Sequence, residues 1–259
     1  MDDLSLAGKV AIITGSGRET GIGAGIAHTL ASNGAWVVIN HISDKTAHRA
    51  ANVAESIVQN TTGKAVVVQA DVSTPEGAKK LVEESLKQFE VDHVDILVNN
   101  AANGNPEPFL KASSSSMETL FKSIVFAPVY LIQSAIPHMP RGGRIINTGS
   151  VATRLGMGPT AIYGAAKAAV ESMTFSMAMD LGRGFGVTIN TIAPGPVETD
   201  ALPKEFAQKI HEPLIAMTKA EERVGTAEDI ADAVLLLCSE KSRWITGQVI
   251  SVSGGITGG

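Results

Sequence analysis

Short apolar runs alternate with segments of helical periodicity along almost the whole chain. The first run is Val10–Ile13, and the segment after it places Ile22, Ile26 and Leu30 on one face of a helix. Six more apolar runs follow, at residues 36–39, 65–68, 96–98, 144–146, 187–189 and 249–252. Because these runs are continuous rather than alternating, both faces of their sheet should be covered by helices. The pattern predicts an α/β fold with a seven-stranded, doubly wound parallel sheet.

Capping residues and turn formers locate several helices and one long connection. Thr74 followed by Pro75 indicates the start of a helix, and the run Ser-Ser-Met-Glu at residues 115–118 has the form of a capping box. No linker rich in proline, glycine or serine divides the chain, so we expect one domain over residues 1–259. The stretch 198–222 has no strand pattern, and we expect it to form a helical lid over the substrate. Its apolar residues include Leu202, Phe206, Leu214 and Met217.

The overall composition narrows the partners and the cellular setting. The net charge is -5 and no stretch is strongly basic, which argues against nucleic acid as a partner. No apolar stretch reaches the roughly 20 residues of a membrane span, and the acidic N-terminal residues lack the pattern of a signal peptide. We therefore expect a cytoplasmic protein without a membrane partner. The histidines show no metal-ligand spacing, so no metal is expected, and Cys238 lies in an apolar run that predicts a buried thiol.

A glycine-rich loop follows the first predicted strand and precedes a helix. Residues 14–23 read Thr-Gly-Ser-Gly-Arg-Glu-Thr-Gly-Ile-Gly. Glycines at such a place let backbone N–H groups approach a pyrophosphate, whose charge then meets the positive end of the helix. The loop therefore predicts a Rossmann-type dinucleotide site at the carboxyl ends of the strands. Its candidate binding residues are Gly15, Ser16, Gly17, Arg18, Gly21, Ile22 and Gly23.

The end of the second predicted strand indicates which dinucleotide is bound. NAD sites usually place a carboxylate there for the ribose 2′-hydroxyl, but this strand ends in Asn40 and His41. A 2′-phosphate would be attracted by Arg18 in the glycine loop, and Asn40 and Ser43 could donate hydrogen bonds to it. Asp44 is open to two interpretations, as a displaced NAD-type acid or as a cap of the following helix, and we expect the cap. The sequence favours NADP(H).

A phenol and an ammonium one helical turn apart are the candidate groups for the chemical reaction. Tyr163 and Lys167 have the spacing that places side chains on one helix face. A neighbouring cation favours the phenolate, which makes the phenol able to give or take an alcohol proton during hydride transfer. Ser150 follows a predicted strand at the same sheet edge and could orient the substrate oxygen. Such a tyrosine–lysine pair also arises by chance, so alone it is only suggestive.

Taken together, these motifs resemble the short-chain dehydrogenase/reductase superfamily, in the branch with a Tyr-x-x-x-Lys pair. The resemblance extends over essentially the whole chain, and the occurrence of all the motifs in order is far more specific than any one of them. The matching pieces are the loop 14–23, Asp71 with Val72, the run 99–101, Ser150, Tyr163 with Lys167, the segment 194–199 and the run 253–255.

The resemblance implies a role for each matching residue. Tyr163 would be the acid/base, Ser150 would hold the carbonyl oxygen, and Lys167 would bind the nicotinamide ribose and lower the pKa of the phenol. Further cofactor contacts would come from Asp71 and Val72 at the adenine, from Asn99 and Ala101, and from Pro194, Gly195, Val197 and Thr199 at the nicotinamide amide.

Within the superfamily, the chain looks most like fungal naphthol-type and bacterial acyl-carrier ketone reductases. These enzymes prefer NADPH and are commonly tetramers. The resemblance thus implies an NADPH-dependent oxidoreductase, a homotetramer, that reduces a small-molecule ketone or imine in specialised metabolism, with Tyr163 as the proton donor.

The chain departs from the family pattern at three places. The glycine loop is two residues longer than usual, and Ala102 stands where the pattern has glycine. Ile124 stands where the family has an asparagine that supports a water relay to the lysine, and the adjacent Ser123 should face another side of the helix. A second hypothesis therefore remains open, a cofactor-binding protein or a non-redox catalyst that reuses the pocket. Ile124 favours it, whereas the intact Ser150, Tyr163 and Lys167 favour the reductase.

Overall fold

The structure is a computed structural model, which describes residues 4–103, 107–200 and 204–258. Its seven strands form a single parallel sheet, which confirms the predicted architecture. The inner strands are buried along their whole length, as expected for continuous apolar runs covered on both faces. The strands are β1 (Val10–Ile13), β2 (Trp36–His41), β3 (Lys64–Gln69), β4 (Ile96–Asn99), β5 (Arg144–Thr148), β6 (Thr188–Pro194) and β7 (Val249–Val252).

The order of the strands places the ligand-binding edge. The order is β3-β2-β1-β4-β5-β6-β7, so the chain moves outward in one direction from β1 and then in the other from β4. Ile13 at the end of β1 pairs with Ile39 of β2 on one side and with Val98 of β4 on the other. In such a sheet the crevice lies outside the carboxyl ends of the strands where the order reverses. Here that point lies between β1 and β4.

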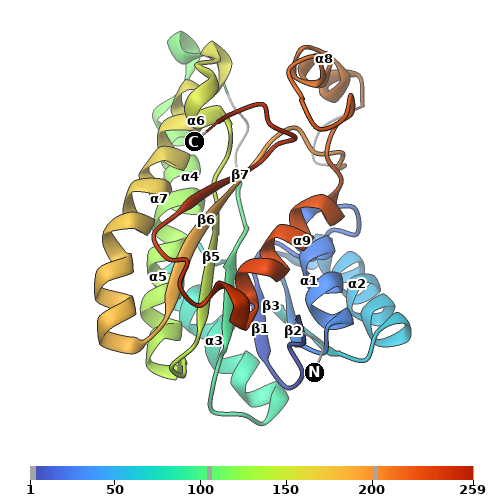
Figure 1. The fold of residues 1–259 in the computed structure, drawn as a ribbon, viewed down its shortest axis with the longest axis vertical. Coiled ribbons are helices and arrows are strands. Elements are labelled where there is room, and N and C mark those ends of the chain that lie inside the picture. Colours follow the sequence, from blue (N-terminus) through green and yellow to red (C-terminus); the bar gives the residue numbers. More distant parts are fainter. Residues whose placement is uncertain (1–3, 104–106, 201–203, 259) are drawn as a thin grey trace.

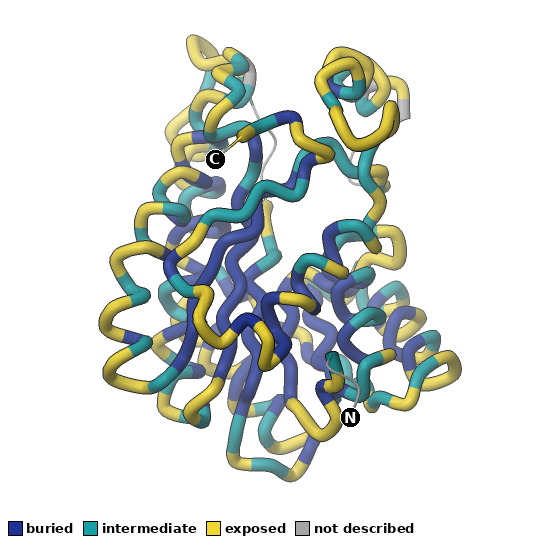
Figure 2. The backbone as a smooth tube through the Cα atoms, in the orientation of Figure 1, coloured by how far each residue is buried: buried dark blue, intermediate teal, exposed yellow. Residues whose placement is uncertain are grey.

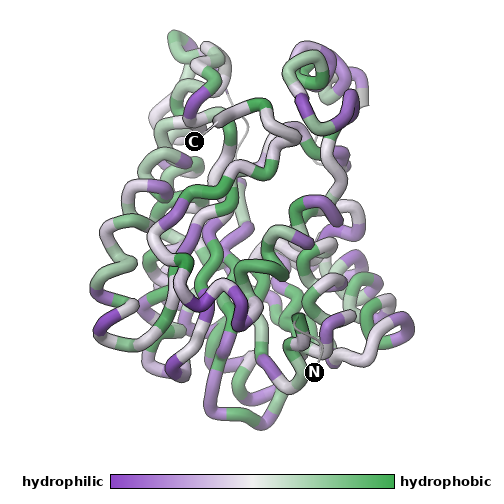
Figure 3. The backbone as a smooth tube through the Cα atoms, in the orientation of Figure 1, coloured by the Kyte–Doolittle hydropathy of each residue, from purple (hydrophilic) through white to green (hydrophobic). Residues whose placement is uncertain are grey.

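Helices cover both faces of the sheet (Figure 1). Buried side chains of α1 (Ile22–Ser32), α2 (Ala47–Asn60) and α9 (Ala227–Cys238) form the core on one face. Those of α3 (Pro75–Phe89) and α5 (Ala127–Ala135) form the core on the other face, where the end of α7 (Ala161–Asp180) packs against them. The central strands are the most buried part of the backbone (Figure 2), and hydrophobic residues are frequent along them (Figure 3). The helices are α1 (Ile22–Ser32), α2 (Ala47–Asn60), α3 (Pro75–Phe89), α4 (Ser114–Phe121), α5 (Ala127–Ala135), α6 (Ala152–Leu155), α7 (Ala161–Asp180), α8 (Lys204–Ile215) and α9 (Ala227–Cys238).

Helices α4 and α5 belong to one continuous helical run, Ser114–His138, joined by a π-type turn at Lys122–Phe126. By length and composition this run could cross a membrane, but half of its most apolar window is buried inside the protein. The run packs against α3 and α7, so its hydrophobicity is that of a core helix. Its N-cap is Ser113, whose side chain accepts a hydrogen bond of 3.1 Å from the N–H of Ser116. The predicted capping box thus starts two residues too late, because several serines in a row compete for the cap.

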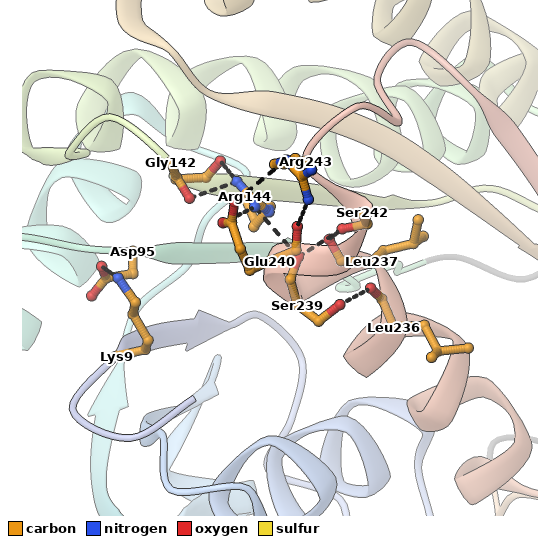
Figure 4. Close-up of polar contacts among 11 residues, drawn as sticks. Lys9, Asp95, Gly142, Arg144, Leu236, Leu237, Ser239, Glu240, Ser242 and Arg243 are labelled. Carbon is orange, nitrogen blue, oxygen red and sulfur yellow. Dashed lines mark hydrogen bonds and ion pairs between the residues drawn. The ribbon is translucent and has the colours of Figure 1, made fainter. Parts of the chain in front are cut away.

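Polar contacts join segments at the amino ends of the strands, the edge opposite the crevice (Figure 4). Arg144, at the start of β5, donates to the backbone oxygens of Gly142 at 2.6 Å and Ser239 at 3.3 Å, and it pairs with Glu240. Lys9 and Asp95 form an ion pair of 2.9 Å beside the starts of β1 and β4. The contacts of Arg144 tie the segment after α9 to the start of β5, and the Lys9–Asp95 pair joins the starts of β1 and β4.

The structure confirms the prediction for Cys238 but not the one for Asp44. Cys238 is buried, as predicted, and burial raises the pKa of its thiol to about 12, which makes it an inert core residue. Asp44 does not cap the helix that follows it, because α2 begins after Thr46 and none of the described side chains caps it. Asp44 instead lies exposed in a short 3₁₀ turn, Asp44–Thr46.

Candidate active site

The glycine loop between β1 and α1 is packed so closely that two positions require glycine. Gly15 has a φ of +64°, and a Cβ there would lie 2.9 Å from the Cα of Ala101. A Cβ on Gly23 would lie 2.6 Å from Nδ2 of Asn100. Helix α1 starts directly after the loop, with Gly21 as its N-cap and no side chain in the capping role. The loop therefore presents backbone N–H groups of a helix N-terminus to the crevice, as an anion site requires.

Asn40 and Ser16 tie this loop to the sheet. Asn40 is buried, accepts a hydrogen bond of 3.2 Å from the N–H of Gly15, and donates from Nδ2 to the backbone oxygen of Ala70 at 3.1 Å. The hydroxyl of Ser16 donates to the oxygen of Ile13 at 2.7 Å and accepts from the N–H of Asn40 at 3.0 Å. The Asn40 amide, which the sequence predicts as a donor to the 2′-phosphate, is thus already engaged with backbone groups, as buried polar groups usually are.

Arg18 is the cation placed to meet a phosphate beside the end of β2. Its side chain is 46% exposed and lies 3.7 Å from the carboxylate of Asp200. It also borders the main cavity of the protein, which lies at the carboxyl edge of the sheet. His41 also borders the cavity, and its Nδ1 lies 3.0 Å from the backbone oxygen of Ser43. The two extra residues of the loop include Glu19, which pairs with Arg49 of α2. Positive and negative side chains therefore lie together at this end of the cavity. Of Arg18, Glu19, Arg49 and Asp200, Arg18 is the one that borders the cavity.

The main cavity has a volume of about 580 Å³ and lies at the carboxyl edge of the sheet. Its size is in the range of small-molecule sites. The predicted residues that border it are Gly15, Gly17, Arg18, Gly21, Ile22, Gly23, Asn40, His41, Asp71, Val72, Ala101, Tyr163, Lys167 and Thr199. The predicted residues outside its lining are Ser16, Ser43, Asn99, Ser150, Pro194, Gly195 and Val197.

Asn99 shows why a strand-end residue can miss the cavity. Its side chain is buried and donates a hydrogen bond of 2.8 Å from Nδ2 to Oδ1 of Asn147 on the neighbouring strand. Asn100, the next residue, borders the cavity instead and donates from Nδ2 to the backbone oxygen of Thr14 at 2.9 Å. Side chains of adjacent residues in an extended chain point in opposite directions. The side chain of Asn99 therefore points into the core, and that of the next residue, Asn100, borders the cavity.

Tyr163 and Ser150 form a hydrogen-bonded pair at the edge of this cavity. Burial raises the pKa of the Tyr163 phenol, and the hydrogen bond with the Ser150 side chain partly counteracts that effect. The Ser150 hydroxyl also accepts a hydrogen bond of 3.1 Å from the N–H of Ala152. The pKa of the phenol is thus raised, whereas the family resemblance implies that Lys167 lowers it, because desolvation is the largest effect on the phenol. The phenol is therefore protonated at neutral pH.

Lys167 is buried beside the phenol. Its Nζ donates to the backbone oxygen of Thr148 at 2.6 Å and lies 5.8 Å from the centroid of the Tyr163 ring. Burial lowers the pKa of this ammonium to about 8, and the charge of Glu171 acts in the opposite direction. Spacing on α7 placed the tyrosine and the lysine on one face, and the geometry brings them together with Ser150 as the sequence predicts.

Ile124 lies in the π-type turn and packs in an apolar cluster. It is 2% exposed and its cluster includes Leu120 and Val170, with Tyr163 packed against it. The hydroxyl of Ser123 points elsewhere, as expected, and exchanges hydrogen bonds with the backbone N–H and oxygen of Asn103 at 3.0 and 2.8 Å. The apolar side chain thus continues the core up to the Tyr163 phenol.

The expected lid is helical but is only partly described. Leu202 lies outside the described residues, as does the side chain of Phe206. Leu214 of α8 is buried, whereas Met217 is 45% exposed, so these two do not share one inward face. Within the described part of residues 198–222, Thr199 borders the main cavity, whereas Leu214 and Met217 do not. Helix α8 stands apart from the other helices in Figure 1.

Comparisons with known proteins identify the family. A family model described as Enoyl-(Acyl carrier protein) reductase matches residues 15–257. The chain is a short-chain dehydrogenase/reductase. This dehydrogenase/reductase is 38% identical over 262 residues to the short-chain dehydrogenase/reductase FrzI of Cladobotryum sp, and the match covers 97% of each chain. It is 37% identical over 265 residues to the hydroxynaphthalene reductase-like protein Arp2 of Metarhizium acridum, with 97% of this chain and 96% of that protein covered.

A solved structure shows the same architecture. The dehydrogenase/reductase superposes on the angucycline C-6 ketoreductase LanV with bound NADP with a TM-score of 0.89. The two share 34% sequence identity, and the match covers 97% of this chain and 96% of LanV. The fold, the strand order and the family therefore agree with each other.

Several cavity residues of this dehydrogenase/reductase were not predicted from its sequence. They come from the ends of β2, β3 and β5, from the loop after β4, and from α4 with its π-type turn. They are Ile42, Thr46, Ala70, Ser73, Asn100, Ala102, Asn103, Thr119, Lys122, Ser123 and Thr148. Most of them stand next to predicted residues in the sequence, so extending each predicted strand end by a few residues would have included them. Thr119 and Lys122 had no such signal, because only the packing of α4 brings them to the cavity.

Proposed function

We propose that this dehydrogenase/reductase is an NADP(H)-dependent oxidoreductase that reduces a ketone or imine, with Tyr163 as the proton donor. The observation that carries the proposal is the hydrogen bonding of two cavity residues: the Tyr163 phenol with the Ser150 side chain, and the buried Lys167 ammonium with the backbone oxygen of Thr148. A protonated phenol is the form that reduction of a carbonyl needs, because the alkoxide must receive a proton as the hydride arrives.

The glycine cradle fits a dinucleotide. The closest approaches at Gly15 and Gly23 leave no room for a Cβ, which is what a backbone that contacts a pyrophosphate requires. Among the residues that the structure describes, the hydroxyl of Thr148, buried at the cavity wall, has no hydrogen-bond partner. Arg18 supports a ligand with a 2′-phosphate, and LanV, which has the same fold, carries NADP. The bound dinucleotide would supply the hydride, held by the glycine loop, Asp71, Val72, Ala101, Lys167 and Thr199.

The protein residues then have separate tasks. Ser150 donates a hydrogen bond that orients the substrate oxygen beside the phenol. Tyr163 gives its proton to that oxygen. Lys167, in its ammonium form, favours the phenolate that remains and so lowers the free energy of the proton transfer. Ile124 and its cluster exclude water from the inner side of the phenol.

We further propose an aromatic or otherwise bulky ketone of specialised metabolism as the substrate. The names of Arp2 and LanV, a hydroxynaphthalene reductase-like protein and an angucycline ketoreductase, support this class. We also propose a soluble, cytoplasmic homotetramer of one-domain subunits. Large apolar side chains such as Phe175, Met179 and Trp244, which are 62–96% exposed, support burial in an assembly.

The decisive experiment is the loss of NADPH absorbance with purified protein and a panel of ketones and imines. The panel contains polycyclic aromatic ketones, aliphatic ketones, small charged keto acids and cyclic imines. We expect turnover with the aromatic ketones and little with the keto acids. Equal or better activity on the small keto acids would contradict the substrate class. Mass photometry of the same sample tests the tetramer.

A second candidate function is a cofactor-binding protein or a non-redox catalyst that uses the same cavity. The apolar Ile124 beside Tyr163 favours it, because the family position holds a polar side chain for a water relay. Binding of NADPH, measured by fluorescence titration, without turnover of any panel member would support this candidate over the reductase.

A further inference from the structure

Helix α7 carries a third ionisable group on the face of the candidate site. Tyr163, Lys167 and Glu171 are spaced four residues apart, which places the phenol, the ammonium and the carboxylate along one side of the helix. The first two belong to the proposed mechanism, but Glu171 has no part in it. Its side chain is half-buried under the turn that follows β5.

The carboxylate of Glu171 is connected to the turn that carries Ser150. The hydroxyl of Thr153 on α6 lies 3.1 Å from Oε1 of Glu171 and 3.0 Å from the backbone oxygen of Ser150. A Cβ on Gly149, the residue before Ser150, would lie 3.2 Å from the same carboxylate oxygen and 2.7 Å from Cγ2 of Thr191, so the carboxylate packs closely against this turn. Glu171 therefore lies directly behind the residues that present the Ser150 hydroxyl to Tyr163.

The charge of Glu171 acts on Lys167 from one helical turn away. The carboxylate raises the pKa of the Lys167 ammonium, against the larger effect of burial, which lowers it. In the other direction, burial raises the pKa of Glu171, whereas the hydrogen bond from Thr153 and the charges of Arg154 and Lys167 lower it. The groups that face Glu171 are thus Lys167 on its own helix and Thr153 and Arg154 on α6. The hydrogen-bond acceptor at Lys167 Nζ is the backbone oxygen of Thr148.

We infer that Glu171 is a positioning residue of the candidate site, which keeps Lys167 in its ammonium form and, through Thr153, fixes the turn that presents Ser150. A buried ammonium without a nearby anion readily loses its proton, and a neutral amine no longer favours a phenolate. The inference rests on the proposed function for its effect on turnover. Its effect on the protonation of Lys167 does not depend on any reaction.

The direct test follows Lys167 by NMR in protein labelled with 13C at the lysine Cε atoms. The signal of Lys167 is the one missing from the spectrum of Lys167→Arg. In Glu171→Gln the amide keeps a hydrogen-bond acceptor for Thr153 but loses the charge. We expect the titration of Lys167 to move to lower pH by roughly 0.5 to 1 unit, as for the loss of a nearby opposite charge. Coinciding titrations in the two proteins would overturn the inference.

Control variants separate the charge from the hydrogen bond. Glu171→Asp keeps the charge, so the titration of Lys167 should stay close to that of the unchanged protein. Thr153→Val removes the hydroxyl that connects Glu171 to Ser150 but leaves the carboxylate, so it should lower kcat without moving the titration. Thr153→Ser should restore kcat. If Glu171→Gln does not fold, Glu171→Met, which has a similar shape and no charge, takes its place in the NMR test.

The kinetic arm uses kcat/KM against pH for NADPH-dependent reduction. We expect the alkaline limb of this profile to move to lower pH in Glu171→Gln, in parallel with the NMR titration. A shifted titration without turnover of any substrate would leave the inference standing and would count against the proposed function. A shifted profile with an unshifted titration would refute the role of Glu171 through Lys167.

Discussion

The side chain of Lys167 crosses from α7 to the end of β5, where its Nζ donates a hydrogen bond of 2.6 Å to the backbone oxygen of Thr148. This contact satisfies one donor of a cation that is almost fully buried. A carbonyl oxygen carries no full charge, so it only partly offsets the loss of hydration. The ammonium is therefore held in place but can be deprotonated within an accessible pH range, and this property leads to the first prediction.

We expect kcat/KM for reduction to fall as the pH rises through about 8. Burial lowers the pKa of Lys167 to about 8, so the ammonium is complete below that pH and is lost above it. The pKa of Tyr163 is raised, so the phenol stays protonated across the same range. The limb should approach about a tenfold loss per pH unit if the ammonium is required. Initial rates between pH 6 and 10 measure it, and a flat profile would show that the charge of Lys167 is not needed.

Replacing Tyr163 by phenylalanine should abolish most of the activity. The change removes the proton donor but keeps the ring that packs against the Ile124 cluster. Loss of a positioned general acid costs about 10²–10⁴-fold in turnover. The chain has two tyrosines, and Tyr130→Phe is the matched control because Tyr130 belongs to the core around α3 and α5. NADPH affinity should hardly change in either variant. Turnover of Tyr163→Phe within a few-fold of the unchanged protein would exclude the phenol as the acid.

Arg18→Ala should weaken the binding of NADPH much more than that of NADH. Arg18 borders the cavity, and a guanidinium binds a phosphate through charge-assisted hydrogen bonds. Arg49→Gln is the control, because it also removes a positive charge but pairs with Glu19 and Asp200 outside the cavity lining. Fluorescence titrations with both dinucleotides measure the effect. Tighter binding of NADH than of NADPH by the unchanged protein would refute the proposed cofactor preference.

Asn40→Asp should destabilise the protein rather than convert it to NADH. A sequence comparison with NAD sites suggests the conversion, but the amide of Asn40 is buried and donates to the backbone oxygen of Ala70. A carboxylate there would lose the donor and face a carbonyl, at about 1–3 kcal/mol for the unsatisfied group alone. We expect a lower Tm and weaker binding of both dinucleotides. An unchanged Tm with a gain in NADH affinity would show that the side chain can turn to the ribose.

Ile124→Asn tests whether the apolar residue slows the reaction. The structure predicts a loss of stability of about 1–3 kcal/mol, since a polar amide would enter a cluster with Leu120 and Val170. Ile124→Val, which should lose about 0.5–1.5 kcal/mol, is the control for packing. In stopped-flow experiments the unchanged protein should transfer the first hydride faster than it cycles. Ile124→Asn, but not Ile124→Val, should reduce the difference between the rate of the first hydride transfer and the rate of steady-state cycling. Identical cycling of both variants would make Ile124 a packing residue only.

The sequence by itself determined the sheet, the family and most of the cavity. Continuous apolar runs can be satisfied only by strands covered on both faces, so seven parallel strands followed from local pattern alone. The glycine loop and the tyrosine–lysine spacing were equally visible, because each depends on residues close together in the sequence. Cys238 was placed correctly in the core for the same reason.

Only the tertiary structure decided which polar side chains face the cavity and which form hydrogen bonds with other parts of the chain. Asn40 and Asn99 stand at strand ends where cofactor residues are expected. Asn99 instead donates to Asn147 of the neighbouring strand, and the amide of Asn40, although this residue borders the cavity, donates to the backbone oxygen of Ala70. The link from Glu171 through Thr153 to Ser150 joins residues of two helices and a turn, and no local pattern contains it. The reason is physical: burial and hydrogen-bond satisfaction depend on which segments meet across the sheet, and those contacts form between residues far apart in the chain.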